Sequence, residues 1–508
     1  WKVTPNLTLN LGLRIEHETP VTERYNRAIA GFNGTATNPI SAQALANYAA
    51  HPVAGIPNFQ VLGGLQYLGG SNGRDLWSGQ SIEFLPRIGL AYQVAPKTVI
   101  RTGFGIYYDT LGIYRSPAIQ TGFTASTPLV ASYDNGVTYA ASFANPFPTG
   151  LIAPSGSSLG LATNLGQAIT VYPANRPLPY AERWSFDLQR EMPGGFLLDL
   201  AYVGNHALHL SVTRQLNNTP EQYLSTSPAR DQNTINYLTS TFPNPFYGLN
   251  SVYTSTINRL TLLEPYPEFG AISETDPAGY SHYNALQIQA IKRFARGFTL
   301  KGSYTFSKLL DASSFLNSAD AQPWYGVSNY DRTYAFAITA VWELPFGRGR
   351  ALGSHVPRIV DGVIGGWQVS TMTVGQSGDP LTWGNIIFNG DVNNIDLPAG
   401  QRTVSQWFNT TSGFVTGAAF QLADNVRTFP LRFAGVRGPR QLLISTSAAK
   451  SFPIHERLNF QLRIDAYNTP NHPNFNDPNL TVTSGAFGQI TAMNGYPREV
   501  QVAARLRF

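Results

Sequence analysis

Two short patterns contain residue types that are used in nucleophilic catalysis and in metal binding. Residues 69–73, with the sequence Gly-Gly-Ser-Asn-Gly, match the Gly-x-Ser-x-Gly motif, which exposes a serine on a strained turn between a strand and a helix. No helical periodicity follows this segment, so we interpret it as a loop. His206 and His209 are three residues apart, a spacing that points them to opposite faces of an extended strand. They would share a metal ion only if the strand had already turned, and a solvent-exposed pair is the simpler interpretation.

A third pattern carries oxygen ligands of the kind that calcium prefers. Asp391, Asn393 and Asp396 lie in a stretch rich in Asn and Gly, but the stretch lacks the central Gly and the final Glu of an EF-hand loop. A polar turn is therefore favoured. The sequence contains no Cys, which excludes thiol catalysis, Cys-ligated metals and disulfides. It also contains no Gly-rich phosphate-binding motif.

Acidic residues on candidate strands form a fourth group. Glu16 lies near Glu18, and Asp187 lies near Arg183, as members of acid–base pairs often do. On alternating strands, these side chains are more simply polar groups that face water. The sequence therefore predicts no catalytic, cofactor-binding or metal-binding residue and no enzymatic activity, and it leaves the ligand-binding residues unknown.

Composition narrows the class of protein. Charged residues make up 13% of the 508 residues, against a usual share of roughly 25%, while the 12% of aromatic residues is too high for a disordered chain. The net charge of +5 is spread without a block of Lys or Arg, which argues against nucleic-acid binding. The sequence has no apolar run long enough for a transmembrane helix. The segment after Trp1 lacks the pattern of a signal peptide, so we expect the native start to lie upstream.

Alternation of apolar and polar residues is the dominant signal. It begins with Leu9, Leu11 and Leu13, which alternate with Asn10 and Gly12. Twelve such windows occur, at residues 7–16, 84–94, 98–109, 182–192, 196–206, 282–294, 298–310, 334–345, 366–376, 440–452, 457–468 and 498–508. A tilted strand of this length spans on the order of 25 Å, the height of the apolar band of an outer-membrane barrel. The sequence therefore predicts a transmembrane antiparallel β-barrel, with apolar side chains facing lipid and their neighbours facing a wet interior.

The links between these windows alternate in length. The short links are residues 95–97, 193–195, 295–297 and 453–456, and the long links are residues 17–83, 110–181, 207–281, 311–333, 377–439 and 469–497. Short periplasmic turns and long extracellular loops are typical of outer-membrane barrels. Residues 346–365, which include Arg348, Arg350 and Arg358, are the exception and are predicted to form an unusually large periplasmic turn.

The last window ends in a terminal aromatic residue. Val500, Val502, Ala504, Leu506 and Phe508 form its apolar face. An alternating strand that ends in Phe resembles the assembly signal that outer-membrane barrels present to the barrel assembly machinery, which is therefore an expected partner. Aromatic rings near strand ends also suit the membrane interface; they are Tyr92, Tyr107, Tyr108, Trp184, Tyr202, Tyr283, Phe306, Trp342, Trp367, Phe452 and Phe508.

Ten segments resemble one family in their residues and in their order. The most specific are Ser-Tyr-Thr-Phe-Ser-Lys at 303–308, Trp-Glu-Leu-Pro-Phe-Gly-Arg-Gly-Arg at 342–350, Gly-Gly-Trp-Gln at 365–368, Arg-Gly-Pro at 437–439 and Asn-His-Pro-Asn-Phe at 471–475. Further segments lie at 1–14, 86–92, 201–205, 283–287 and 292–294. From end to end, the chain resembles the barrel region of the Oar-like TonB-dependent receptors.

The resemblance implies a barrel of about 22 strands, preceded by a plug domain and often by a carboxypeptidase-regulatory-like domain. Residues 1–508 are then expected to be the C-terminal portion of the barrel, without the plug and the N-terminal domain. The implied partners are outer-membrane lipid and the TonB energy-transducing complex, reached through the missing plug segment. The implied function is transport or reception of an unidentified ligand, and loops rich in Asn, Ser, Thr and Tyr favour carbohydrates or peptides.

Two other functions fit a barrel with long loops. The first is a surface adhesion or structural protein, which would not depend on proton-motive force. The second is a complete twelve-stranded outer-membrane hydrolase, which would need a Ser, a His and an acid within hydrogen-bond reach of one another. An upstream plug domain would favour the transporter, and an immediate signal peptide would favour the twelve-stranded barrel.

Overall fold

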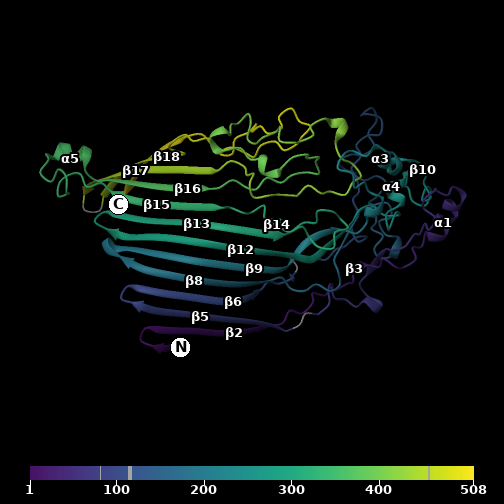
Figure 1. The fold of residues 1–508 in the computed structure, drawn as a ribbon, viewed down its shortest axis with the longest axis horizontal. Helices are drawn as coiled ribbons and strands as arrows, with labels where there is room; N and C mark the ends of the chain where they lie inside the picture. Colours follow the sequence, from purple (N-terminus) through teal and green to yellow (C-terminus); the bar gives the residue numbers. More distant parts are fainter. Residues whose placement is uncertain (80–81, 113–116, 456–457) are drawn as a thin grey trace.

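The computed structural model describes residues 1–79, 82–112, 117–455 and 458–508. Figure 1 shows long strands lying side by side in one sheet, with irregular segments and short helices gathered at one end. The sheet is antiparallel along a path of β1-β2-β5-β6-β8-β9-β12-β13-β15-β16-β17-β18-β19. Twelve of these strands are long, and each overlaps one of the twelve predicted windows, so the predicted strand number and order are confirmed.

The long strands are β2 (Leu7–Glu16), β5 (Glu83–Ala95), β6 (Thr98–Tyr108), β8 (Tyr180–Met192), β9 (Phe196–Gln215), β12 (Ile272–Ala295), β13 (Phe298–Ala312), β15 (Tyr334–Glu343), β16 (Trp367–Gln376), β17 (Gln441–His455), β18 (Leu458–Tyr467) and β19 (Glu499–Arg507). The short strands are β1 (Lys2–Thr4), β3 (Ile29–Phe32), β4 (Leu65–Tyr67), β7 (Ile169–Val171), β10 (Thr241–Pro243), β11 (Thr256–Asn258) and β14 (Gly326–Val327). The α-helices are α1 (Ser41–Ala50), α3 (Gln232–Thr239), α4 (Arg259–Leu262) and α5 (Arg358–Ile364). None of the helices in the described part of the chain is long and apolar enough to cross a membrane.

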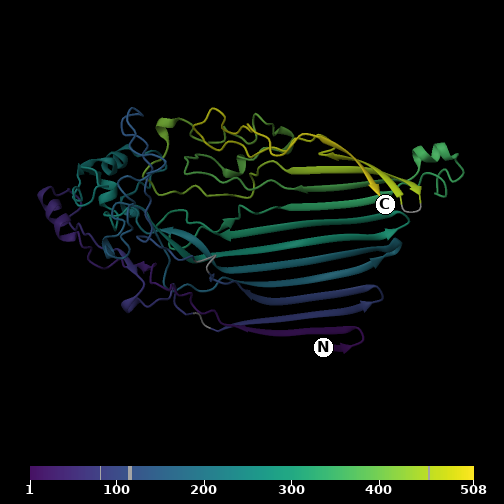
Figure 2. The same cartoon turned by 180° about the vertical axis from the view of Figure 1, so that it is seen from behind.

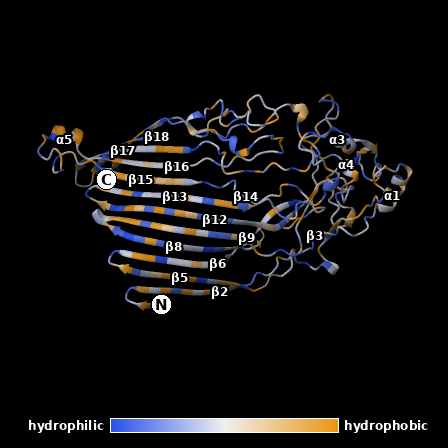
Figure 3. Cartoon of the chain, viewed as in Figure 1, coloured by the Kyte–Doolittle hydropathy of each residue, from blue (hydrophilic) through white to orange (hydrophobic). Residues whose placement is uncertain are grey.

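One face of the sheet is an exposed apolar band. Leu11 lies opposite Ile88 on β5, and Ile88 lies opposite Phe104 on β6. The exposed fractions are 68% for Leu11 and 40% for Phe104, and Leu9 and Phe460 are also partly exposed. No second protein layer covers these residues among those described. Because a soluble protein rarely exposes so extended an apolar surface, the band fits lipid, as the alternation predicts (Figure 3).

The opposite face is polar. Arg101 on β6 lies opposite Asp187 on β8, and the guanidinium groups of Arg87 and Arg183 stack on the ring of Tyr107 at 4.9 and 5.3 Å. The prediction that Tyr107 belongs to the interface belt is therefore wrong, because this ring lies on the inner face. Tyr283, which is opposite Asn205 and Leu309 in the register, also lies on the inner face and is corrected in the same way.

The two ends of the sheet differ as the link lengths predict. Figure 2 shows both chain termini and α5 at one end, while α1, α3 and α4 lie at the other. The tight turn after β5 has Lys97 at φ +64°, and the turn after β12 has Arg296 and Gly297 at φ +53° and +75°. The turn after β8 is the 3-10 segment Pro193–Gly195. The predicted turn at 453–456 is partly taken up by β17, and its last residue lies outside the described residues.

Strands β9 and β12 are longer than predicted. The prediction ends one strand at His206 and starts the other at His282, whereas the structure continues their pairing to Gln215 and Ser273. The register shifts between Asp276 and Gly279 and again between Gly279 and Ser281, and His209 has a left-handed φ of +56°. Because each bulge moves the following side chains to the other face, the alternation of apolar and polar residues is interrupted there. The sequence pattern therefore does not reveal that β9 and β12 continue.

The hydrophobic clusters of the described residues lie in the long links. Ala44, Phe59, Leu238 and Phe246 pack together from the first and third links. A second cluster around Trp383 joins the fifth link to the sixth; its buried members are Leu381, Trp383, Ile386, Ile395, Phe408, Phe429, Val436 and Val482. We call the packed long links the loop cap. Because the loop cap has cores of its own, it can hold side chains in fixed positions above the sheet.

Candidate functional site

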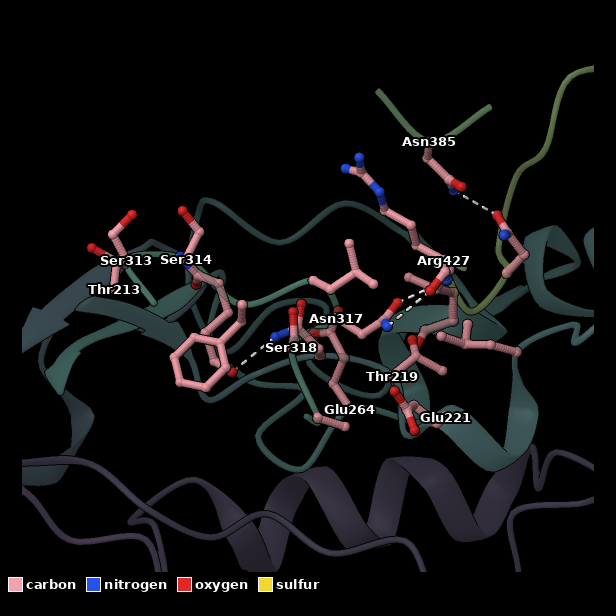
Figure 4. A pocket seen from close by; sticks show the side chains of 18 residues that line it. Thr213, Thr219, Glu221, Glu264, Ser313, Ser314, Asn317, Ser318, Asn385 and Arg427 are labelled. Carbon is pink, nitrogen blue, oxygen red and sulfur yellow. Dashed lines mark hydrogen bonds between the residues drawn. The ribbon is translucent and has the colours of Figure 1, made fainter. Parts of the chain in front are cut away.

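The loop cap contains a cavity of about 750 Å³ between three of the long links. Its walls come from the end of β9 and the segment after it, from the residues that follow β13, and from the link between β16 and β17. Figure 4 shows the labelled side chains that line it, which are Thr213, Thr219, Glu221, Glu264, Ser313, Ser314, Asn317, Ser318, Asn385 and Arg427. Most of these groups are hydroxyls or amides.

Asn317 joins two of these links. Its Oδ1 accepts a hydrogen bond from the backbone N–H of Arg427 at 2.7 Å, and its Nδ2 donates to the carbonyl of the same residue at 3.1 Å. Asn385 makes a similar contact on the far wall, where its Nδ2 donates to Oδ1 of Asn425 at 2.8 Å. The position of the cavity wall therefore depends on side-chain amides that connect segments distant in sequence.

The arginines at the cavity are already paired. Arg427 donates from Nη2 to the Trp383 carbonyl at 2.7 Å and from Nε to the Phe429 carbonyl at 2.9 Å. Arg214, on β9 beside the cavity, donates to Asp276 at 2.9 Å and lies over the Phe315 ring at 4.0 Å. Because these guanidinium groups are bound to the protein, they position the walls and are poorly placed to recognise an anionic ligand.

Glu264 is, with Glu221, one of the two acidic residues of the cavity wall. Burial raises the pKa of its carboxyl from 4.5 to about 8, and its Oε2 accepts a hydrogen bond from Asn217 Nδ2 at 3.2 Å. Since a group with this pKa holds its proton at pH 7, Glu264 is a neutral donor in the cavity. The cavity wall thus presents mainly hydroxyl and amide groups that can donate and accept hydrogen bonds.

The sequence gives no local sign of this cavity. Thr213, Ser313 and Asn385 belong to different links, and they meet only because the loop cap packs. The single available signal is the general richness of the long links in Asn, Ser and Thr, which predicts polar loops but not where a cavity forms.

The catalytic and metal-binding patterns are separated from this cavity. Ser71 lies in an exposed 3-10 turn, Gly70–Asn72, and the next regular element in the described part is β5, so the strand–turn–helix arrangement is not formed. The His206 ring stacks on His282 at 4.1 Å, with Nδ1 3.7 Å from Glu182. His209 Nδ1 instead lies 3.1 Å from the Leu178 carbonyl. The two histidines therefore have different partners. Both lie on β9 and are half-buried, so the interpretation as a solvent-exposed pair is wrong.

The acidic patterns are polar turns and strand contacts. Asp391 accepts hydrogen bonds from the backbone and side chain of Asn393, both at 2.9 Å, and Asp396 pairs with Arg402 at 2.6 Å. Over the described residues, we find no group of three or more possible metal ligands. The carboxylates on and beside the strands also have partners within the protein. Glu16 forms an ion pair with Arg14, Glu18 accepts a hydrogen bond from Thr110 at 2.7 Å, and Asp187 accepts one from Ser185 at 3.1 Å.

Comparison with known families decides the class of protein. Residues 1–501 match the family described as outer membrane beta barrel domain. The chain belongs to this family. An outer-membrane β-barrel is an integral protein of the outer membrane, so the exposed apolar band is its lipid-facing surface. A search of curated proteins found no match.

Solved structures similar to this outer-membrane barrel are transporters and receptors by their descriptions. The outer membrane transporter YddB from Escherichia coli has a TM-score of 0.41 at 10% identity, over 84% of this chain and 41% of its own. The ferric-catecholate import receptor Fiu from E. coli K12 has 0.40 at 9%, over 100% and 43%. The ferripyoverdine receptor of Pseudomonas aeruginosa has 0.40 at 10%, over 100% and 37%. The chain spans less than half of the length of each.

The expected assembly signal is an edge strand of the barrel. Val500, Val502, Ala504 and Leu506 lie on β19, where Val502 is opposite Ile464 and Leu506 is opposite Phe460 in the register. These residues therefore continue the lipid-facing band. Phe508 follows the strand and is almost fully exposed.

Proposed function

We propose that this outer-membrane barrel is the barrel portion of an Oar-like TonB-dependent transporter that binds a neutral carbohydrate or peptide in the loop cap. The observation that carries this proposal is the cavity of about 750 Å³, walled by hydroxyl and amide groups from three links. Pockets of this size bury most of a small ligand. The paired arginines and the protonated Glu264 favour neutral hydrogen-bonding ligands over strongly charged ones.

The domain arrangement is part of the proposal. In the described part of the chain, β2 and β19 are the outermost long strands and do not pair with each other. In lipid, unpaired backbone groups at such edges cost several kcal/mol each. About ten further strands between these edges would complete the barrel of roughly 22 strands that the Oar-like segments imply, with a plug and a carboxypeptidase-regulatory-like domain before them.

Energy would then come from the TonB complex, which acts on the plug, and the barrel assembly machinery would insert the protein. We propose no enzymatic activity, because among the described residues Ser71 lies in an exposed turn, and His206 and His209 contact His282 and the Leu178 carbonyl. The Gly365–Trp367 and Asn471–Phe475 motifs support the Oar-like assignment, since they lie at strand ends and turns, as recurrent barrel segments would.

Binding by the intact protein in outer-membrane vesicles tests the ligand site. We expect neutral maltooligosaccharides or neutral tetrapeptides to bind, and citrate not to bind. Asn317→Ala should weaken the binding roughly tenfold, because losing the two contacts to Arg427 costs about 1–2 kcal/mol. The matched control is Asn393→Ala in the polar turn, which should leave binding unchanged. Equal binding of citrate, or no effect of Asn317→Ala, would contradict the site.

A measurement of ligand uptake by cells distinguishes the transporter from the alternative of an adhesion protein. With the ligand class found above, accumulation in cells should stop when the TonB complex is deleted, while surface binding remains. An adhesion protein would bind the ligand equally in both strains and accumulate it in neither. Release of cleaved ligand would instead favour the hydrolase.

A further inference from the structure

The link between β15 and β16 is the large turn at the periplasmic end of the barrel. It contains α5, which Figure 1 shows beyond the strand ends, on the same side as both chain termini. A turn that only reverses the chain needs a few residues, so this segment has a structure of its own that calls for an explanation.

The C-terminal end of α5 is fixed to the lipid-facing side of the wall. Lys450 on β17 donates from Nζ to the carbonyls of Val363, at 3.1 Å, and Gly365. Trp367 Nε1 donates to the same Val363 carbonyl at 2.9 Å. Lys450 and Trp367 are register partners, and Lys450 also lies opposite Leu462, which is part of the apolar band. These contacts place the end of the helix at the outer surface of the barrel.

Lys450 would be costly in this position without α5. A lysine on the lipid face of a barrel destabilises it by a few kcal/mol near the bilayer centre and less toward the interface. Here Lys450 is only 4% exposed, and its ammonium group lies 5.4 Å from the Trp367 ring and 5.1 Å from the Phe452 ring. The helix carbonyls and two interfacial aromatic rings therefore cover a charge that would otherwise face lipid.

The helix itself exposes apolar side chains. Ile359 is 86% exposed and Val363 is 67% exposed, and their spacing of four residues puts them on one face. Val360 beside them and Leu352 before the helix are also exposed. Figure 3 shows the apolar character of α5 next to the band on the strands. The apolar surface of the barrel thus continues onto α5.

Basic groups accompany this apolar face. Arg348 and Arg358 are exposed, while Arg350 pairs with Glu343 at 3.3 Å. Asp361, the one acidic residue of the helix, accepts a hydrogen bond from the backbone N–H of Arg348 at 2.7 Å. The exposed charge of the segment is therefore positive, which suits lipid phosphates.

We propose that α5 lies in the periplasmic leaflet of the outer membrane, with Ile359 and Val363 among the acyl chains and Arg348 and Arg358 at the phospholipid phosphates. Short apolar helices with basic flanks bind membranes in this interfacial manner. The helix then anchors the periplasmic rim of the barrel and, through Lys450, fixes β16 and β17 at a set depth.

A fluorescent probe on the helix tests this placement. The 508 residues contain no Cys, so Ile359→Cys in the intact protein can be labelled at one position with the environment-sensitive dye NBD. In vesicles of phosphatidylethanolamine and phosphatidylglycerol, acyl-chain bromination should quench this probe by at least roughly twofold. Ser354→Cys, in the polar part of the same turn, is the matched control and should be quenched much less.

A second variant separates docking from folding. Lys450→Met should lower the quenching at position 359 while the barrel keeps its heat-modifiable mobility, because the helix loses its fixation and the wall does not. If brominated lipid does not quench the probe at position 359, the proposal is wrong, and aqueous iodide then distinguishes the two alternatives. Strong quenching by iodide would place α5 in the periplasm, and quenching by neither agent would place it against a protein partner.

Discussion

Two glutamates in the loop cap have raised pKa values, one fully buried and the other half-buried beside the cavity. Glu268 is fully buried, and within the described residues neither carboxyl oxygen has a hydrogen-bond partner. Burial raises the pKa of both Glu264 and Glu268 from 4.5 to about 8. Between these two values the folded protein holds protons that the unfolded chain releases, so the stability of the loop cap should fall as the pH rises from about 4.5 to 8.

Replacing these acids by amides should remove that pH dependence. We expect Glu264→Gln with Glu268→Gln to raise the free energy of unfolding of the intact protein more at pH 8 than at pH 5, by on the order of 1–3 kcal/mol, and so to raise its thermal midpoint more at pH 8. The midpoint can be followed by tryptophan fluorescence in detergent. Glu191→Gln, an exposed carboxylate at the periplasmic end of β8, is the control and should shift neither value. A shift that is equal at both pH values would mean that the glutamates are ionised in the folded protein.

The alternation along each strand assigns neighbouring residues to opposite environments. Ile338 and Thr339 are adjacent at the middle of β15; Ile338 lies opposite Gly302 on the lipid side, and Thr339 lies opposite Lys301 on the inner side. Ile338→Arg should destabilise the inserted barrel by about 2–4 kcal/mol, and Thr339→Arg by less than about 1 kcal/mol. The fraction of heat-modifiable protein in the outer membrane measures the difference, and equal losses would show that the faces are not as assigned.

Two substitutions at the end of the terminal strand test whether it acts as an assembly signal. Phe508→Ala should lower the amount of barrel inserted in the outer membrane severalfold, because the exposed ring is where the assembly machinery would bind. Arg507→Ala, whose register partner is Asn459 on the inner face, is the matched control and should insert normally. A normal yield of the Phe508→Ala protein would show that the strand is not the signal.

The strands could be predicted because their information is local. Leu9, Leu11 and Leu13 specify both a strand and its lipid face through a period of two. The extension of β9 could not be predicted, because the bulge at His209 interrupts that period. The cavity could not be predicted for a different reason: Asn317 and Arg427, which are hydrogen-bonded in its wall, are 110 positions apart in the sequence. Such contacts depend on how the links pack, and the links have no periodic sequence pattern from which their packing could be predicted.

At the scale of the whole chain, the described residues form an open sheet with a folded cap, and the edges of this sheet determine whether it is stable in lipid. Strand β2 carries only the short β1 on its outer side, and β19 pairs with β18 alone in the described part. An open edge leaves backbone N–H and C=O groups without partners in the bilayer. The cap does not remove this cost, because its cores lie in the links beyond the strand ends.

We therefore expect residues 1–508, exported with a signal peptide but without further strands, to be degraded or to remain unfolded, whereas the intact protein forms a heat-modifiable barrel. Cys pairs placed across β2 and β19 test the alternative, since the chain has no Cys of its own. Pairs scanned from Asn10 to Arg14 against Gln501 to Arg505 should not form a disulfide in the intact protein, because the strands of a larger barrel would separate these edges. A disulfide in any of these pairs would require Cα atoms within about 7 Å and would establish a closed twelve-stranded barrel instead.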